Sequence, residues 1–258
     1  MVLQENIRIQ REIAFQDERY SDQNIQQKRT NKVSRFYQLT KSIHQEYKQF
    51  IFQNSKNVKT VEIGCGVGSY AIDLAQNGAD TVTGIDISTI AIDISSSKAK
   101  KKGVEHNLFF EVMNAEDLQF NSSSVDLICG GAILHHLDIE KAMQSMTKTL
   151  QANGKAIFIE PLGHNILINF FRHLTPAIRS EDEHPLLDTD LELFQEYFKK
   201  VEIKYFYLTA LAASLFAGSP GFDFVLSKLE FIDRQLFKLP FLQKQAWQVL
   251  IRLSEPIK

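Results

Sequence analysis

A glycine-rich stretch followed by a single acidic residue is the part of the sequence best suited to hold a ligand. Gly64, Gly66 and Gly68 follow the apolar run of residues 58–63, and Asp86 ends the next apolar run. A glycine-rich turn between a strand and a helix lets the backbone approach a ligand and points helix N-terminal amides at it. A carboxylate at the end of the second strand can accept hydrogen bonds from ribose hydroxyls. The pattern predicts a site for a ribose-containing ligand.

Two details of this loop disfavour a dinucleotide. The dinucleotide fingerprint is G-x-G-x-x-G, and Ser69 stands where its third glycine belongs. Glu62 precedes Gly64 by two positions, so its carboxylate would repel a pyrophosphate. An adenosine with a cationic amino-acid tail suits these residues better. We therefore expect S-adenosylmethionine as the cofactor.

Strand and helix patterns alternate around the loop. Periodicity and turn signals predict strands at 58–63, 81–86, 107–112, 124–130, 155–160, 201–208 and 246–253, and helices at 67–77, 88–103 and 138–150. The strand at 155–160 follows a turn, "QANG", and is nearly all apolar, as a strand covered on both faces would be. The alternation predicts an α/β fold, a doubly wound Rossmann-like sheet of seven strands.

The remaining segments are expected to cap this core within one domain, residues 1–258. Residues 1–52 form an N-terminal helical cap with an amphipathic helix over 29–52, residues 58–160 form the cofactor-binding core, and residues 161–258 supply the acceptor side and the last strands. In this last part we expect an irregular segment over 161–187, a capping box at Thr189 and Glu192, and an inserted apolar helix over 222–239.

Aromatic side chains are frequent in these caps. They are Phe15, Tyr20, Phe36, Tyr37, Phe170, Phe171, Phe216, Phe222 and Phe224. Such a set suggests an apolar or planar acceptor in a mostly hydrophobic pocket, and an ordinary helical core is the alternative interpretation. The aromatics of the inserted helix that lie off its main apolar face suggest contact with the acceptor, a membrane surface or a second copy of the chain.

Five motifs in order resemble the class I S-adenosylmethionine-dependent methyltransferases, in particular the small-molecule group. These are "VEIGCGVG", "GIDIS", "NAEDLQF", "SVDLICGGAILHHL" and "LQANGKAIFIEP", which together cover about residues 58–160. The resemblance implies methyl transfer to a small acceptor, with S-adenosylhomocysteine as the product. It also implies that Asp126, early in the fourth strand, has a structural role.

The resemblance assigns cofactor contacts residue by residue. They are Tyr20, Glu62, Gly64, Cys65, Gly66, Gly68, Asp86, Ile87, Asn114, Ala115, Glu116 and Gly130. Asn114 departs from the family, which more often has Asp at the start of this segment after the third strand. Glu62 is expected near the amino group of the cofactor. Phe15 and Tyr20 resemble an N-terminal segment that closes over the cofactor, and a helix that packs on the sheet is the alternative interpretation.

Histidines are the candidate catalytic residues. His135 follows the fourth strand, while His164 and His184 lie in the segment after the fifth strand, where ligands of open α/β sheets bind. A neutral imidazole can serve as general base for an acceptor hydroxyl. Methyl transfer without any general base is the alternative, and we expect no metal site.

Composition and the remaining patterns narrow the function classes. The formal net charge of −2 gives no reason to expect nucleic acid. Cys65 and Cys129 lie in apolar or glycine-rich stretches, as buried thiols in a reducing compartment would, and no signal-peptide pattern is seen, so we expect a cytoplasmic protein.

Two other functions are the alternatives to methyl transfer. An NAD(P)-dependent short-chain oxidoreductase would need a Tyr-x-x-x-Lys pair after the loop, but the pair present, Tyr37 and Lys41, precedes it. A cofactor-binding subunit of the same fold that has lost its chemistry also remains open.

Overall fold

The computed structural model describes residues 2–21, 38–175 and 179–258. The helix expected over 29–52 therefore lies partly outside the described residues, as do Phe36 and Tyr37. Its described part consists of a 3-10 turn, η1 (Gln38–Thr40), followed by α3 (Lys41–Asn54).

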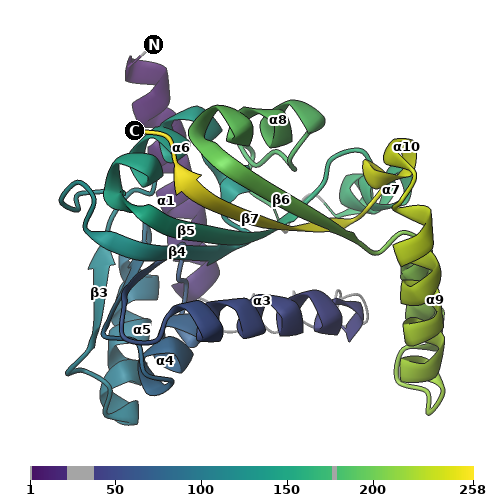
Figure 1. The fold of residues 1–258 in the computed structure, drawn as a ribbon, viewed down its shortest axis with the longest axis horizontal. Coiled ribbons are helices and arrows are strands. Elements are labelled where there is room, and N and C mark those ends of the chain that lie inside the picture. The colour runs from purple at the N-terminus through teal and green to yellow at the C-terminus, as the bar shows by residue number, and fades with distance from the viewer. Residues whose placement is uncertain (1, 22–37, 176–178) are drawn as a thin grey trace.

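A seven-stranded mixed sheet forms the centre of the molecule, with the strand order β3-β2-β1-β4-β5-β7-β6 (Figure 1). Its strands are β1 (Lys59–Ile63), β2 (Thr81–Asp86), β3 (Leu108–Val112), β4 (Val125–Gly131), β5 (Leu150–Pro161), β6 (Phe198–Phe206) and β7 (Gln248–Pro256). The first five run parallel, and β7 is antiparallel to both β5 and β6. The predicted fold class is confirmed. The strand order reverses between β1 and β4, which is where open α/β sheets bind ligands.

Helices cover both faces of the sheet. They include α4 (Ser69–Gln76), α5 (Thr89–Lys102), α6 (Ile139–Thr149) and α8 (Asp188–Tyr197). The side chains of Ser88 and Asp138 cap α5 and α6, each accepting a hydrogen bond from a first-turn backbone N–H. These two helices begin within a residue of the predicted position.

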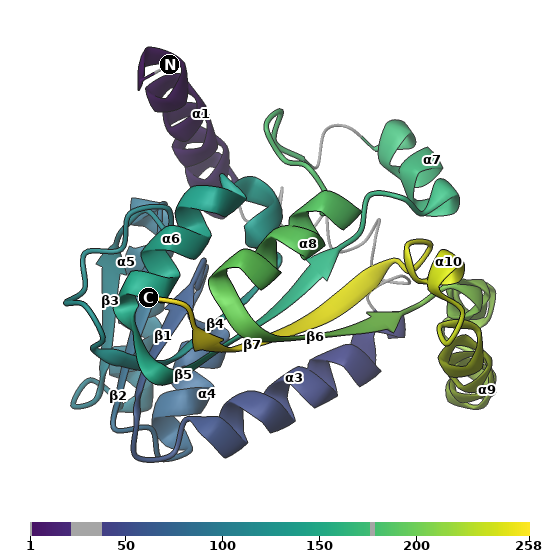
Figure 2. The same cartoon turned by 45° about the horizontal axis from the view of Figure 1, so that its top comes forward.

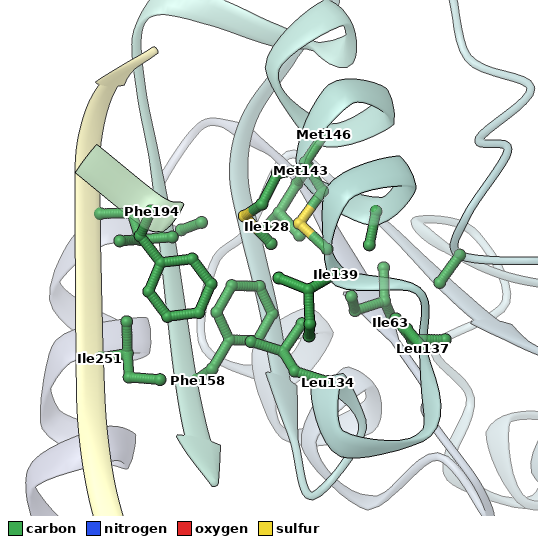
Figure 3. Close-up of a cluster of buried hydrophobic side chains, with 14 of the residues drawn as sticks. Ile63, Ile128, Leu134, Leu137, Ile139, Met143, Met146, Phe158, Phe194 and Ile251 are labelled. Carbon is green, nitrogen blue, oxygen red and sulfur yellow. The ribbon is translucent and has the colours of Figure 1, made fainter. Parts of the chain in front are cut away.

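Buried residues of β5 alternate between the two faces. Phe158 packs with Met143 and Met146 of α6 and with Phe194 of α8 (Figure 3). Ile157 belongs to a second cluster on the other face, together with residues of α3 and α4. Because both faces are covered, a continuous apolar run is needed at β5, as the sequence indicated.

Three local predictions differ from the structure. Residues 151–154 form an irregularity within β5 rather than a turn before it. Leu150 of β5 pairs with Val125 of β4, but the next pair joins Lys155 of β5 to Leu127 of β4. The segment expected to be irregular contains a helix, α7 (Ile166–Leu174). Helix α8 begins at Asp188 rather than after Thr189, because the Asp190 carboxylate accepts a hydrogen bond from the backbone N–H of Leu187.

The terminal segments add α1 (Val2–Ser21), a 3-10 helix η4 (Thr209–Phe216), α9 (Phe222–Leu236) and α10 (Pro240–Gln243). Helix α3 packs against α9, where Ser42 Oγ donates to Glu230 Oε1 at 2.6 Å. This contact joins the helix expected over 29–52 to the inserted helix. Within the described ranges, no helix combines the length and the apolar character needed to span a membrane.

Candidate functional site

The glycine loop between β1 and α4 adopts a backbone conformation that glycine favours. Gly64, Gly66 and Gly68 have φ values of 62°, 51° and 74°. A Cβ on Gly68 would lie 2.6 Å from the Phe110 ring, and one on Gly66 would lie 2.7 Å from the Tyr20 hydroxyl oxygen. Larger residues would therefore meet both backbone strain and a steric clash.

Two acidic residues hold this loop. Asp86 Oδ2 accepts a hydrogen bond from Gly66 N at 2.8 Å, and its Oδ1 accepts one from Ser88 N at 3.0 Å. Glu62 Oε2 accepts a hydrogen bond from Ala71 N, in the first turn of α4, at 2.7 Å. Burial raises the pKa of Asp86 and raises the pKa of Glu62 to about 8. Both carboxyl groups thus fix the loop to the strands beneath it.

A cavity of about 630 Å³ opens beside the loop, a size typical of small-molecule sites. Seven of the predicted cofactor residues line it: Tyr20, Gly64, Asp86, Ile87, Asn114, Ala115 and Glu116. The other five predicted residues, Glu62, Cys65, Gly66, Gly68 and Gly130, lie behind the lining, whereas Val67 and Gly131 contribute to it. Glu62 is buried against α4, so in this structure it supports the loop rather than the cavity wall.

Helix α1 closes one side of the cavity. Phe15 and Tyr20 of α1 line it, as expected for an N-terminal segment that covers the cofactor. Arg8 Nη2 lies 2.5 and 2.6 Å from the two carboxylate oxygens of Glu116, and Arg8 Nη1 donates to the carbonyl of His136 at 3.1 Å. Beyond these contacts, the first turns of α1 extend past α6 (Figure 2).

A histidine and a buried carboxylate meet at the ends of β4 and β5. His135 Nδ1 lies 2.7 Å from Glu160 Oε2. The other oxygen of Glu160 accepts hydrogen bonds from Ile133 N at 2.9 Å and Leu134 N at 2.8 Å, and the residue is fully buried. This carboxylate orients the ring of His135, which lines the cavity.

A second histidine is held by α1. His136 Nδ1 lies 3.1 Å from Glu12 Oε1. Burial of Glu12 opposes its charged form, but the hydrogen bond and charge of His136 outweigh burial and lower the pKa of Glu12 to about 2. Both residues line the cavity, so its wall carries a second histidine–carboxylate pair.

Glu183 completes a cluster with these two histidines. One potential ligand atom from each of His135, His136 and Glu183 lies within 4.8 Å of the others, which makes this a group of described residues that could hold a metal ion. However, Arg172 Nη2 and Arg179 Nε lie 2.8 and 3.2 Å from Glu183 Oε1. Because two guanidinium groups already balance this carboxylate, the cluster is better suited to the polar group of an acceptor than to a cation.

The other two predicted catalytic histidines do not line the cavity. His164 follows the end of β5 and lies 3.5 Å from Asp188 at the start of α8, because the chain turns away from the cavity there. His184 is exposed, and only its backbone N–H approaches the site, donating to the carbonyl of His135 at 2.8 Å. The structure therefore places His135, and neither His164 nor His184, where an acceptor could bind.

Sequence reasoning missed several residues of the site. Those not predicted include Arg8, Glu12, Glu160, Arg172, Arg179, Glu183 and Trp247. Glu160 carried a usable signal, since it is a lone carboxylate at the end of an otherwise apolar strand. The others belong to α1, to the segment after β5 or to the start of β7, whose placement over the core no local pattern indicated.

Only part of the expected aromatic set lines the cavity. Of the described cap aromatics, Phe15, Tyr20 and Phe171 line the cavity, Phe222 is buried in the core, and Phe170, Phe216 and Phe224 are exposed. No residue of 209–245 lines the cavity. Apolar and charged side chains share its walls.

Comparisons with known proteins agree with this geometry. Residues 61–158 match the family described as Methyltransferase domain. The YcgJ methyltransferase of Bacillus subtilis is 27% identical over 150 residues, covering 57% of this chain and 57% of that protein. The ubiquinone/menaquinone biosynthesis C-methyltransferase UbiE of Rickettsia prowazekii is 32% identical over 142 residues, covering 50% and 56%. The matched region thus spans little more than half the length of these relatives.

Solved structures share the fold. Geranyl diphosphate C-methyltransferase of Streptomyces coelicolor, in complex with S-adenosyl-L-homocysteine, superposes with a TM-score of 0.60 at 14% identity, covering 82% of this chain and 80% of that one. Phosphoethanolamine N-methyltransferase 2 of Haemonchus contortus, in complex with S-adenosyl-L-methionine, gives a TM-score of 0.57 at 16% identity, covering 81% and 52%.

The sheet order, the glycine loop and the carboxylate at the end of β2 define a Rossmann-like nucleoside-binding protein. The matching domain makes the identification more specific. Residues 61–158 form a methyltransferase domain, and the comparisons support an enzyme of the class I S-adenosylmethionine-dependent type with S-adenosylmethionine as its cofactor. The positions of Gly64 and Asp86 in the cavity wall fit this cofactor.

Proposed function

We propose that the protein transfers the sulfonium methyl group of S-adenosylmethionine to a small acceptor with an apolar body and a polar reacting group. The observation that carries this proposal is that one cavity joins the glycine loop and Asp86 to the pair formed by His135 and Glu160. A cofactor site and an acceptor site that share a cavity allow direct transfer between two bound molecules.

The cofactor side of the cavity is formed by the ends of β1, β2 and β3. Asp86 is positioned to accept hydrogen bonds from the ribose hydroxyls, while Asn114, Ala115 and Glu116 would flank the adenine. Asn114 Oδ1 accepts a hydrogen bond from Glu116 N at 3.0 Å, so the amide that replaces the family's usual Asp still orders this turn.

The acceptor side offers both kinds of contact that the proposed acceptor needs. Ile168, Phe171 and Trp247 provide apolar surface, and His135 provides a ring nitrogen, Nε2, that its bond to Glu160 leaves for the acceptor. Relatives named for ubiquinone and menaquinone biosynthesis and for geranyl diphosphate favour the same kind of acceptor.

The bound cofactor supplies an electrophilic methyl carbon: the acceptor's lone pair bonds to it while the carbon–sulfur bonding pair passes to sulfur. The chain's own contribution is alignment and exclusion of water by α1 and the loop. Where the acceptor is a hydroxyl, His135 takes its proton, and Glu160 stabilises the imidazolium that forms.

Turnover with methyl-labelled S-adenosylmethionine tests the proposal. The acceptor panel should contain phenols, quinone precursors and isoprenoid alcohols, with sugars and free amino acids as polar controls. We expect label in the amphiphilic acceptors only. Transfer confined to the polar controls would contradict the proposed acceptor class, and cofactor binding without transfer to any panel member would favour the non-catalytic alternative.

A further inference from the structure

Exposed apolar side chains gather at one end of the molecule. Helices α7, α9 and α10 lie at this end in both views (Figures 1 and 2). The exposed apolar residues that these helices carry at this end are together called the apolar end: Ile166, Leu167, Phe170 and Leu174 of α7 and Phe224 and Phe231 of α9. Phe170 is 65% exposed and Phe224 67% exposed, which is unusual for side chains of this size.

Helix α7 connects the apolar end to the cavity. Its outer face carries the four exposed side chains, while Ile168, Phe171 and Arg172 on the opposite face line the cavity. Asn165 caps this helix, accepting a hydrogen bond from Ile168 N at 3.0 Å. A molecule held at the apolar end would therefore lie one helix away from the acceptor side.

The exposed charge beside the α9 aromatics is positive. Lys228 Nζ lies 5.4 Å from the centroid of the Phe224 ring, and Arg234 Cζ lies 5.7 Å from that of Phe231. Two exposed lysines, at positions 238 and 244, flank α10.

The acidic residues of α9 are engaged elsewhere. Asp223 pairs with Lys41 of α3 at 2.9 Å, and Glu230 accepts a hydrogen bond from Ser42. Asp233 is buried and accepts hydrogen bonds from Leu208 N and Thr209 N. Aromatic and basic side chains thus share the outer face of α9, and the charge of its exposed acidic residue, Asp223, is balanced by Lys41.

We propose that the apolar end rests on a membrane surface that contains anionic lipid. Aromatic side chains inserted at the level of the headgroups, with Lys and Arg beside them, are the pattern by which amphipathic helices bind such surfaces. A second copy of the chain could also bury these aromatics. However, a symmetric pair uses the same patch of both copies, so it would bring two basic surfaces together.

The inference goes beyond methyl transfer, although a membrane would also concentrate the amphiphilic acceptor proposed above. Flotation of the whole chain with vesicles tests it. One set of vesicles contains phosphatidylcholine alone, and the other contains phosphatidylglycerol as well. We expect binding to the second set, weakened by salt because surface charges are screened.

The test variant carries Phe224→Ser and Phe231→Ser, and its matched control is Phe109→Ser on β3. Phe109 is 49% exposed but belongs to the edge strand of the sheet, away from the apolar end (Figure 1). The double variant should lose about 10-fold or more in vesicle partitioning, since each Phe contributes apolar area. The Phe109 control should bind as the native chain does, and S-adenosylhomocysteine binding confirms that each variant is folded.

Three results would overturn the inference: no vesicle binding by the native chain, an equal loss in the Phe109 control, or a dimer that the double variant dissociates while vesicle binding is unchanged. The last result would assign the apolar end to a second copy. Vesicle binding without methyl transfer would leave this inference standing and contradict only the proposed function, so the two can be separated.

Discussion

His135 Nδ1 and Glu160 Oε2 lie 2.7 Å apart, and the second oxygen of the same carboxylate binds the backbone N–H groups of Ile133 and Leu134. One buried side chain therefore fixes both the imidazole and the turn that carries it. A base oriented by a carboxylate in this way is a recurring arrangement in catalytic sites. It gives His135 a defined geometry that His164 and His184 lack.

Replacement of the oriented base should reduce turnover without affecting the cofactor. For a hydroxyl acceptor, we expect His135→Gln to lower kcat by about 100-fold or more, because general-base catalysis contributes this much. The affinity for S-adenosylhomocysteine should change by less than about twofold, since His135 lies on the acceptor side. The pH–rate profile should also lose its acid limb.

His164→Gln and His184→Gln are matched controls, because neither residue lines the cavity. Both should keep the native kcat. If either control lost as much activity as His135→Gln, or if His135→Gln turned over at the native rate, the assignment of the base would be wrong.

Glu62 should make the stability of the protein depend on pH. Burial raises its pKa to about 8 in the folded protein, above its ordinary value of 4.5. The folded state therefore holds the proton more tightly, so the stabilisation is complete below about pH 4.5 and is lost as the pH rises toward 8. Each unit by which the pKa of Glu62 differs between the folded and unfolded states corresponds to about 1.4 kcal/mol in the free energy of unfolding.

Chemical denaturation of Glu62→Gln across pH 5 to 8 checks this expectation. The amide keeps an acceptor for Ala71 N but cannot ionise, so its free energy of unfolding should fall less over this range than that of the native protein. Glu105→Gln changes an exposed carboxylate and serves as the control. Parallel pH profiles for the native protein and Glu62→Gln would contradict the prediction.

Arg8 should control how long the cofactor stays bound. It pairs with Glu116, whose side chain is 3% exposed, and holds α1 against the core. The Arg8 side chain is 24% exposed, so solvent weakens its ion pair with Glu116. Removal of the Arg8 side chain would nevertheless leave the buried carboxylate of Glu116 with fewer partners. Arg8→Ala should therefore speed S-adenosylhomocysteine dissociation about fivefold or more in a stopped-flow displacement experiment.

Arg11→Ala is the control for this effect. Arg11 lies on the same helix and contacts Asp182 at 2.6 Å, but its side chain is 51% exposed. Exposed pairs contribute about 0 to 1 kcal/mol, so dissociation should change by less than about twofold. Equal dissociation rates for the native protein and both variants would show that α1 does not retain the ligand.

The cofactor half of the site could be predicted because its signals are local. Lys59 to Asp86 is a single strand–helix–strand passage. Ser88 and Asp138, which cap α5 and α6, are residue types that favour helix N-caps. Apolar runs located the strands, and both-face burial explains why the run of β5 does not alternate. Such features depend on neighbours a few positions away.

The acceptor half could not be predicted because its contacts are distant in sequence. Arg8 and Glu116 are separated by 108 positions, and nothing near either residue identifies the other. His164 was expected at the site from its position after β5, but the direction of the chain beyond Pro161 decides where it lies. The exposed face of α7 likewise depends on which of its faces lines the cavity, and the packing of distant segments decides that.

Calorimetric titration with S-adenosylhomocysteine tests the central claim, that the cavity beside the glycine loop binds this cofactor. We expect one site in the native protein, and Asp86→Ala should weaken binding by about 10-fold to 1000-fold, since a hydrogen bond to a charged acceptor is worth about 1.5 to 3 kcal/mol. NADH should give no heat, because Ser69 stands where the dinucleotide fingerprint needs its third glycine. Unchanged affinity in Asp86→Ala, or binding of NADH in place of S-adenosylhomocysteine, would contradict the account.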